Sequence, residues 1–118
     1  LAAMQAHSSD AVVQQEGCGT LRSLAEHADN AFTIAALGGV DAVLRAMRVH
    51  SEAAVQKLGC AVLRSLAGHP GHAIQITSLV GVDDIQRAMQ AHPADVAVQR
   101  EGCAALRSLA QHAGTGLS

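Results

Sequence analysis

Apolar residues recur at intervals of three and four positions along most of the chain, the spacing that gathers them on one face of an α-helix. The stretch 51–69 has the clearest such run, with Ala54, Val55, Leu58, Val62, Leu63 and Leu66. This run predicts a long helix that buries one side.

A short helix and then a helix of medium length are predicted to follow each long one. The short helix carries Phe32, Ile34 and Leu37 in one part of the chain, and Ile74, Ile76 and Leu79 in another. It stops at Gly38-Gly39 or at Gly81, because glycine tolerates the left-handed conformation that ends helices. The medium helix has Val40, Val43, Leu44 and Met47 on one side, matched by Val82, Ile85 and Met89.

Histidines and turn-forming residues mark the predicted helix ends. Helix-breaking and N-capping residues follow the long helix, at Ala28-Asp29-Asn30 and at His69-Pro70-Gly71. Six histidines end helices: His7, His50 and His92 the medium ones, and His27, His69 and His112 the long ones. We expect these rings to cap helix C-termini, where they can bond free carbonyls and favour the helix dipole. His72 lies outside this pattern, and we expect it in an N-cap-like turn.

Three segments share one pattern: residues 16–28 (EGCGTLRSLAEHA), 58–70 (LGCAVLRSLAGHP) and 101–113 (EGCAALRSLAQHA). Eight of the thirteen positions are identical in all three segments. Cys18, Cys60 and Cys103 are separated by 42 and 43 residues. A period in the low forties is typical of solenoids built from two- or three-helix repeats.

The order of short, medium and long helix resembles the armadillo repeat family, over essentially the whole chain. The resemblance rests on residues 76–82 (ITSLVGV), 40–47 (VDAVLRAM) and 61–67 (AVLRSLA). It implies an all-α fold, a right-handed α-solenoid or armadillo-like superhelix of three-helix repeats of about 42 residues. HEAT repeats, the nearest rival, have two helices per unit and lack the short helix that ends in glycine.

The resemblance divides the chain into one partial and two further repeats. Residues 1–27 are the end of a second helix and a third helix, residues 28–69 are a complete repeat, and residues 70–113 are another. We expect the tail, residues 114–118, to be disordered. Neither end has the polar face of a capping repeat, so we expect a fragment of a longer array.

The amino-acid composition limits the kinds of core and the classes of partner that we expect. Phe32 is the one aromatic residue, so the core must be built from aliphatic side chains in closely packed helices. The net charge of −2 gives no positive excess for binding nucleic acid. No apolar run reaches the length of a membrane span, and the amino terminus lacks the pattern of a secretory signal. These features predict an intracellular, cytoplasmic protein without nucleic acid or membrane partners.

Catalytic and metal-binding motifs are missing from the sequence. The three cysteines occupy one helix position, and helices packed about 10 Å apart would keep them beyond disulfide reach. We expect all three to be buried packing residues in a reducing compartment. Close-set cysteine pairs, a distinguishable Ser-His-Asp set and a glycine-rich phosphate loop are absent. The sequence therefore predicts no enzyme, no cofactor and no metal.

A row of arginines is the most informative constellation. If Cys18, Leu21, Leu24 and Ala25 are the buried side, Gly19, Arg22, Ser23 and Glu26 share the opposite flank. The equivalents are Ala61, Arg64, Ser65 and Gly68 in the second segment, and Ala104, Arg107, Ser108 and Gln111 in the third. By the armadillo resemblance this flank lines a concave groove. An importin-alpha-like groove would carry Trp and Asn at the Gly19 and Ser23 positions, which argues against recognition of nuclear localisation signals.

Two function classes remain for this chain. Arginine presents a planar fork of donors that suits carboxylates, so the groove would bind an extended, acidic segment of a protein partner. The arginines could equally be solvated, or paired with Glu16, Glu26 and Glu101 within their own helices. The alternative function is a structural subunit or spacer in a large assembly, such as a cytoskeletal or ciliary complex. It would contact neighbouring subunits through edge and convex surfaces.

Overall fold

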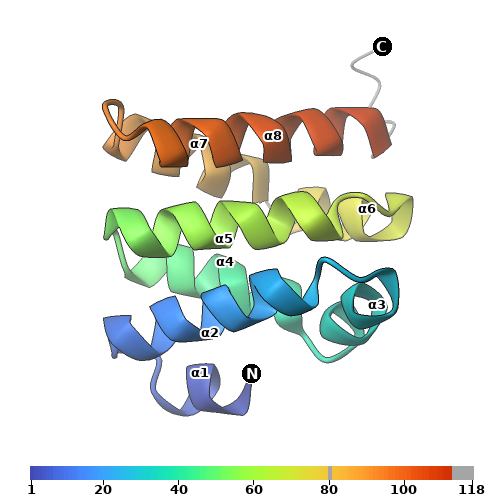
Figure 1. Cartoon of the computed structure of the whole chain (residues 1–118), viewed down its shortest axis with the longest axis horizontal. Coiled ribbons are helices and arrows are strands. Elements are labelled where there is room, and N and C mark those ends of the chain that lie inside the picture. Colours follow the sequence, from blue (N-terminus) through green and yellow to red (C-terminus); the bar gives the residue numbers. More distant parts are fainter. Residues whose placement is uncertain (80, 113–118) are drawn as a thin grey trace.

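The computed structural model describes residues 1–79 and 81–112, and this part of the chain folds into eight α-helices without a β-strand (Figure 1). The helices are α1 (Ala2–Ala6), α2 (Ala11–Leu24), α3 (Ala28–Ala36), α4 (Gly39–Val49), α5 (Ala53–Leu66), α6 (Pro70–Ser78), α7 (Gly81–Ala91) and α8 (Val96–His112). The all-α prediction is confirmed. The tail at 114–118, expected to be disordered, lies outside the described residues.

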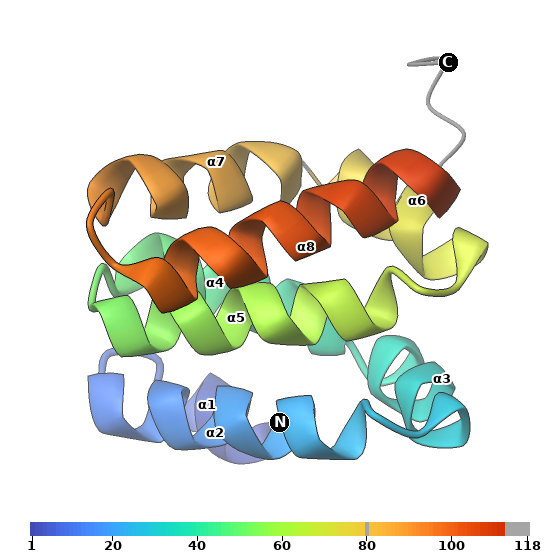
Figure 2. The ribbon, with the colours of Figure 1, turned by 45° about the horizontal axis from the view of Figure 1, so that its top comes forward.

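The three longest helices form one layer. Helices α2, α5 and α8 lie side by side, with α5 in the middle (Figures 1 and 2). Helices α4 and α7 lie behind this layer in Figure 1, and α1 lies behind α2 in Figure 2. Helix α4 contacts both α1 and α7. The long helices are therefore stacked in chain order, and each predicted copy of the arginine pattern falls on a different member of the layer.

Two glycines allow the medium helices to start close against the short ones. Gly38 has a left-handed backbone, with φ of 88°, immediately before α4. A Cβ on Gly39 would lie 2.7 Å from the carbonyl oxygen of Ile34, and one on Gly81 would lie 2.8 Å from that of Ile76. Side chains would not fit at either place. The predicted glycine stops after the short helices are confirmed, since α3 and α6 both end before these residues.

The core is aliphatic, as the sequence predicted, but four expected apolar positions are outside it. Val40, Val43 and Leu44 of α4, and Val55, Val62, Leu63 and Leu66 of α5, are fully or almost fully buried. Leu24, Phe32, Leu37 and Ile74 are exposed, although they lie in the predicted apolar pattern. Each short helix buries one isoleucine, Ile34 or Ile76. Phe32 and Ile74 lie two residues earlier, about 200° around the helix, so they point to the opposite side.

The prediction that His27 and His69 end the long helices is wrong. Helix α2 ends at Leu24 and α5 at Leu66, so His27 and His69 lie beyond them as the N-cap residues of α3 and α6. Neither ring makes a capping hydrogen bond. Nor do Asp29 and Asn30 cap α3, because both lie inside its first turn. His112 is the last residue of α8, and its side chain lies outside the described part.

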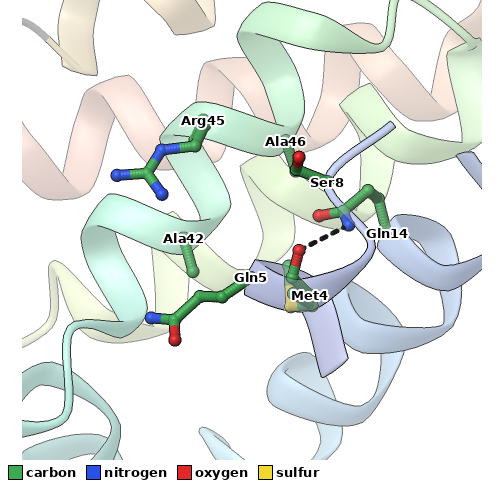
Figure 3. A pocket seen from close by; sticks show the side chains of 7 residues that line it. All are labelled: Met4, Gln5, Ser8, Gln14, Ala42, Arg45 and Ala46. Carbon is green, nitrogen blue, oxygen red and sulfur yellow. Dashed lines mark hydrogen bonds between the residues drawn. The ribbon is translucent and has the colours of Figure 1, made fainter. Parts of the chain in front are cut away.

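A glutamine on each long helix holds the loop that precedes it. The Gln14 side-chain nitrogen donates to the carbonyls of Met4 and His7, both at 2.9 Å, and Figure 3 shows the first of these bonds. Gln56 and Gln99 make the same pair of bonds to the matching residues, which are Met47 and His50, then Met89 and His92. The sequence analysis missed this clamp, although the glutamines recur in register with the cysteines.

Candidate partner-binding surface

The predicted arginines lie on the three members of the long-helix layer. Arg22 is on α2, Arg64 on α5 and Arg107 on α8, at matching positions of adjacent helices. Arg22 and Arg107 are exposed, and neither forms an ion pair with a described carboxylate. These two side chains are therefore open to a ligand carboxylate.

Arg64 makes an ion pair across helices. Its Nε lies 3.1 Å from Oε1 of Glu101 on α8, without the angles of a hydrogen bond. The alternative of pairing within one helix is wrong for Glu101, because α8 packs directly on α5 and Glu101 pairs with Arg64 there. Leu58 occupies the position of Glu101 on α5, which explains why Arg22 has no such partner there.

The rest of the predicted site is mostly small and polar. Ser23, Glu26 and Gln111 are exposed, and Ser65 and Ser108 are half-buried. Ala61 is fully covered, whereas Gly19 and Ala104 are half-buried. An open hollow of about 300 Å³ lies next to Arg107 and is also lined by Arg100, Cys103 and Ala104. This part of the row has both positive charge and room for a ligand group.

A second ionic cluster ties α4 to α7, and the sequence analysis did not single it out. The Asp84 carboxylate is almost completely buried, and Arg48 and Arg87 both bind it. Arg48 also donates to the Leu79 carbonyl at 2.8 Å. The hydrogen bond to Asp84 raises the pKa of Arg48, and burial opposes this effect. Asp84 stands where the preceding medium helix has Ala42, so a charged residue at an apolar position was the available signal.

The histidines after the medium helices bond carbonyls, but in a neighbouring turn. Nε2 of His50 lies 2.7 Å from the Ser8 carbonyl oxygen, and Nε2 of His92 lies 2.6 Å from that of Ser51. A carbonyl only accepts, so each ring donates from Nε2. The expected capping of the ring's own helix is replaced by a link between successive turns. His7 occupies the same position after α1 and is exposed.

One aromatic cluster joins α3 to α6. The rings of Phe32, His69 and His72 have centroids 4.7 to 5.3 Å apart. His72 is buried in the first turn of α6, and its Nδ1 has no hydrogen-bond partner. Burial lowers the pKa of His72, and the neighbouring His69 lowers it further, against an opposing effect of the Leu66 backbone. The structure thus favours the neutral ring.

The three cysteines are not equivalent. Cys18 and Cys60 are fully buried, and burial raises the pKa of each thiol to about 12. Cys103 is exposed, so the prediction that all three are buried is wrong for this residue. No described long helix follows α8, whereas α5 packs on α2, which carries Cys18, and α8 packs on α5, which carries Cys60.

Neither a metal site, nor a membrane-spanning helix, nor a related protein assigns a function to the part of the chain that the structure describes. In residues 1–79 and 81–112, no group of three or more His, Cys, Asp or Glu side chains could hold a metal ion. None of the described helices is both long and apolar enough to cross a membrane. No family model, curated protein or solved structure matches the chain. The arginine row therefore has to be interpreted from its own geometry.

Proposed function

We propose that this chain is an armadillo-like α-solenoid that binds an extended acidic segment of a protein partner along Arg22, Arg64 and Arg107. The helix order supports the assignment, because α3, α4 and α5 run short, medium and long, and α6, α7 and α8 do the same. The arginine positions on three adjacent long helices carry the proposal. On this view the protein is an intracellular, cytoplasmic scaffold and not an enzyme.

The spacing of the long helices suggests the conformation of the ligand. Packed helices lie about 8 to 10 Å apart, so successive arginines start from points separated by about that distance. A polyproline II segment rises about 3.1 Å per residue with three residues per turn, so every third side chain points the same way at about 9 Å intervals. An extended segment with a carboxylate at every third residue therefore matches the row.

Charge and exposure support the same ligand. The guanidinium of arginine can bind both oxygens of a carboxylate, which gives geometric selection as well as attraction. Arg22 and Arg107 are exposed, and the Arg64 side chain keeps 41% of its surface exposed while paired with Glu101. A ligand carboxylate at the middle of the row competes with Glu101, so the outer arginines are expected to contribute most.

A peptide of consecutive Glu-Pro-Pro units tests the proposal. We expect it to bind the chain in fluorescence anisotropy, and a Lys-Pro-Pro peptide of the same length not to bind. Arg107→Glu should weaken binding at least tenfold, because it replaces an attraction by a repulsion. Arg45→Glu is the matched control, since Arg45 is exposed on α4 and outside the long-helix layer.

Three outcomes would contradict the proposal. They are no binding of the Glu-Pro-Pro peptide, equal loss in both arginine variants, and equal binding of a peptide with the same composition but consecutive glutamates. Circular dichroism and thermal melting of each variant establish that the helices are retained. The salt dependence of binding should be steep, because exposed charges are screened at high ionic strength.

The second candidate is a structural subunit of a large intracellular assembly. One observation favours it: apolar side chains such as Val12 and Leu24 are exposed on the outer side of α2. If partner association is unchanged by Arg107→Glu and lost on Leu24→Glu, the structural role is favoured over the arginine row.

A further inference from the structure

Matching positions of the long helices show which side faces the preceding helix. Leu66 is 0% exposed on α5 and Leu109 is 3% exposed on α8, but Leu24 on α2 is 45% exposed. Val62 and Ala105 are likewise buried, whereas the matching Thr20 is exposed. Only α2 lacks a preceding long helix among the described residues. These positions are therefore the ones that a preceding long helix covers.

The opposite pattern identifies the side that faces the following helix. Cys18 on α2 and Cys60 on α5 are completely buried, whereas Cys103 on α8 is exposed. Ala25 and Ala67 are buried, and the matching Ala110 is exposed. Among the described long helices, α8 alone has none after it. These positions are therefore covered by the long helix that follows.

Within residues 1–79 and 81–112, the molecule thus has two complementary sides that no long helix covers. The α2 face comprises Val12, Val13, Glu16, Thr20 and Leu24, and these residues line an open, mostly apolar hollow of about 420 Å³. The α8 face comprises Arg100, Cys103, Ala104, Arg107 and Ala110. Four of its members line the hollow of about 300 Å³ described above, and Ala110 is exposed nearby.

Charges at the two faces match the pair found inside the molecule. Arg64 on α5 pairs with Glu101 on α8, across a junction between successive long helices. The same positions at the uncovered faces are Arg107 and Glu16, both exposed and neither in an ion pair with a described residue. Seating the α8 face on the α2 face would place opposite charges together, as in the internal junction.

We propose that a second copy of this chain seats its α8 face on the α2 face, repeating the packing of α8 on α5 and of α5 on α2. Packing of successive long helices already occurs twice within the chain. The α5–α8 junction supplies the partner chemistry, because apolar positions there surround the pair of Arg64 and Glu101. Two different faces meet, so the contact is heterologous and leaves one face of each kind free for further copies. The proposal does not depend on a ligand at the arginine row.

Sedimentation of the full chain over a range of concentrations tests the association. The average mass should rise beyond that of a dimer. Arg107→Glu and Glu16→Arg should each weaken association at least tenfold, because each places like charges at the junction. Mixing the two variants should restore association, since opposite charges then meet at every junction between them. Arg22→Glu is the matched control, because Arg22 is an exposed arginine of α2 and lines neither of the two hollows.

Two further measurements separate this junction from other contacts. Leu24→Glu places a charge in the apolar hollow and should abolish association, whereas Val49→Glu changes an exposed valine of α4 and should have no effect. Alkylation of Cys103 should slow as the chain associates. Three outcomes would overturn the proposal. The chain stays monomeric, or it stops at a dimer and mixing the two charge variants does not restore association. In the third, Cys103 reacts equally fast in the assembly and in the single chain. Leu24→Glu leaves Arg107 in place and uncovered, so this variant should still bind the Glu-Pro-Pro peptide when association is lost, and the two proposals fail separately.

Discussion

Arg48 of α4 donates from Nε to both oxygens of the buried Asp84 carboxylate on α7, at 3.1 and 2.9 Å. The two partners are unequally exposed: the Asp84 side chain keeps 2% of its surface and that of Arg48 keeps 45%. The consequences of removing either partner therefore differ. Without Asp84, the arginines can be hydrated where they are, whereas without Arg48 the buried carboxylate loses its main partner.

Removing Arg48 should cost more stability than removing Asp84. We expect Arg48→Ala to lower the free energy of unfolding by about 2 to 3 kcal/mol, because a buried charge is left with Arg87 alone. Asp84→Ala, which installs the residue found at Ala42, should cost about 1 kcal/mol or less. Urea unfolding measures both, with Arg45→Ala as the control. A larger loss in Asp84→Ala would contradict this assignment.

The Gln56 clamp should be the most costly of the three glutamine clamps to remove. Gln56 is buried and donates to the Met47 and His50 carbonyls at 2.8 and 2.6 Å. Gln56→Ala leaves two covered carbonyls without donors, and we expect a loss of about 2 to 4 kcal/mol. Gln99→Ala, at a half-buried position, should cost less, and the exposed Gln15→Ala should cost almost nothing. Thermal melting that ranks these variants otherwise would refute the clamp's role.

Protonation of His72 should destabilise the fold in mild acid. Its pKa in the folded chain lies below the ordinary value of 6.5, because of burial and the neighbouring His69. The unfolded chain then binds a proton more readily, so stability is complete above about pH 6.5 and falls as the pH drops toward the lower, folded-state pKa. Melting temperature against pH should fall less steeply for His72→Phe than for the wild type. The exposed His27→Phe is the control, and an unchanged profile in His72→Phe would contradict the prediction.

Cys103 should react with thiol reagents long before the other cysteines. The thiolate is the reactive form, and burial that raises the pKa of Cys18 and Cys60 to about 12 nearly removes it at pH 8. At low protein concentration we expect alkylation of Cys103 to be at least about a thousandfold faster than that of the buried pair. Mass spectrometry of the labelled peptides resolves the three sites. Comparable labelling of Cys60 would show that α8 does not cover it.

Freeing Arg64 should strengthen acidic peptide binding. Glu101→Gln removes the carboxylate that lies 3.1 Å from the Arg64 Nε, so this arginine becomes available to the ligand. The Arg64 side chain keeps 41% of its surface exposed, and an ion pair that water can reach is worth about 0 to 1 kcal/mol, so we expect a gain of up to about fivefold. Glu52→Gln removes one negative charge from an exposed position in the turn before α5 and serves as the control. An equal gain in both variants would indicate a general charge effect only.

The sequence predicted the helices well and the partners of their side chains poorly. Apolar spacing indicated α4 and α5, and the glycines marked where α3 and α6 stop, because both signals act within a few residues of chain. The same reasoning assigned His69 to the end of a long helix, although it precedes α6. Turn residues can belong to either neighbour, and the choice depends on where the preceding helix stops packing.

For the candidate site, the sequence predicted which arginines occupy equivalent positions in the three segments. The structure showed which side chains surround each arginine. Arg22, Arg64 and Arg107 were found from the recurring pattern alone, and they lie on three adjacent helices. The pairing of Arg64 with Glu101 was not found, because it joins residues 37 positions apart that meet only when α8 packs on α5. The pairing of Asp84 with Arg48 was missed for the same reason, since Arg48 lies on a different helix, α4.

The sequence by itself determined that the chain is helical, where glycines end the short helices, and which positions of the three segments correspond. These properties depend on residues that are close together in the chain. Tertiary packing decided which copies of one position are buried. Cys18, Cys60 and Cys103 have almost the same neighbours in sequence, yet only the first two lie under another helix. Burial depends on the helix that packs from elsewhere in the chain, so identical residues in nearly identical local sequence differ in exposure.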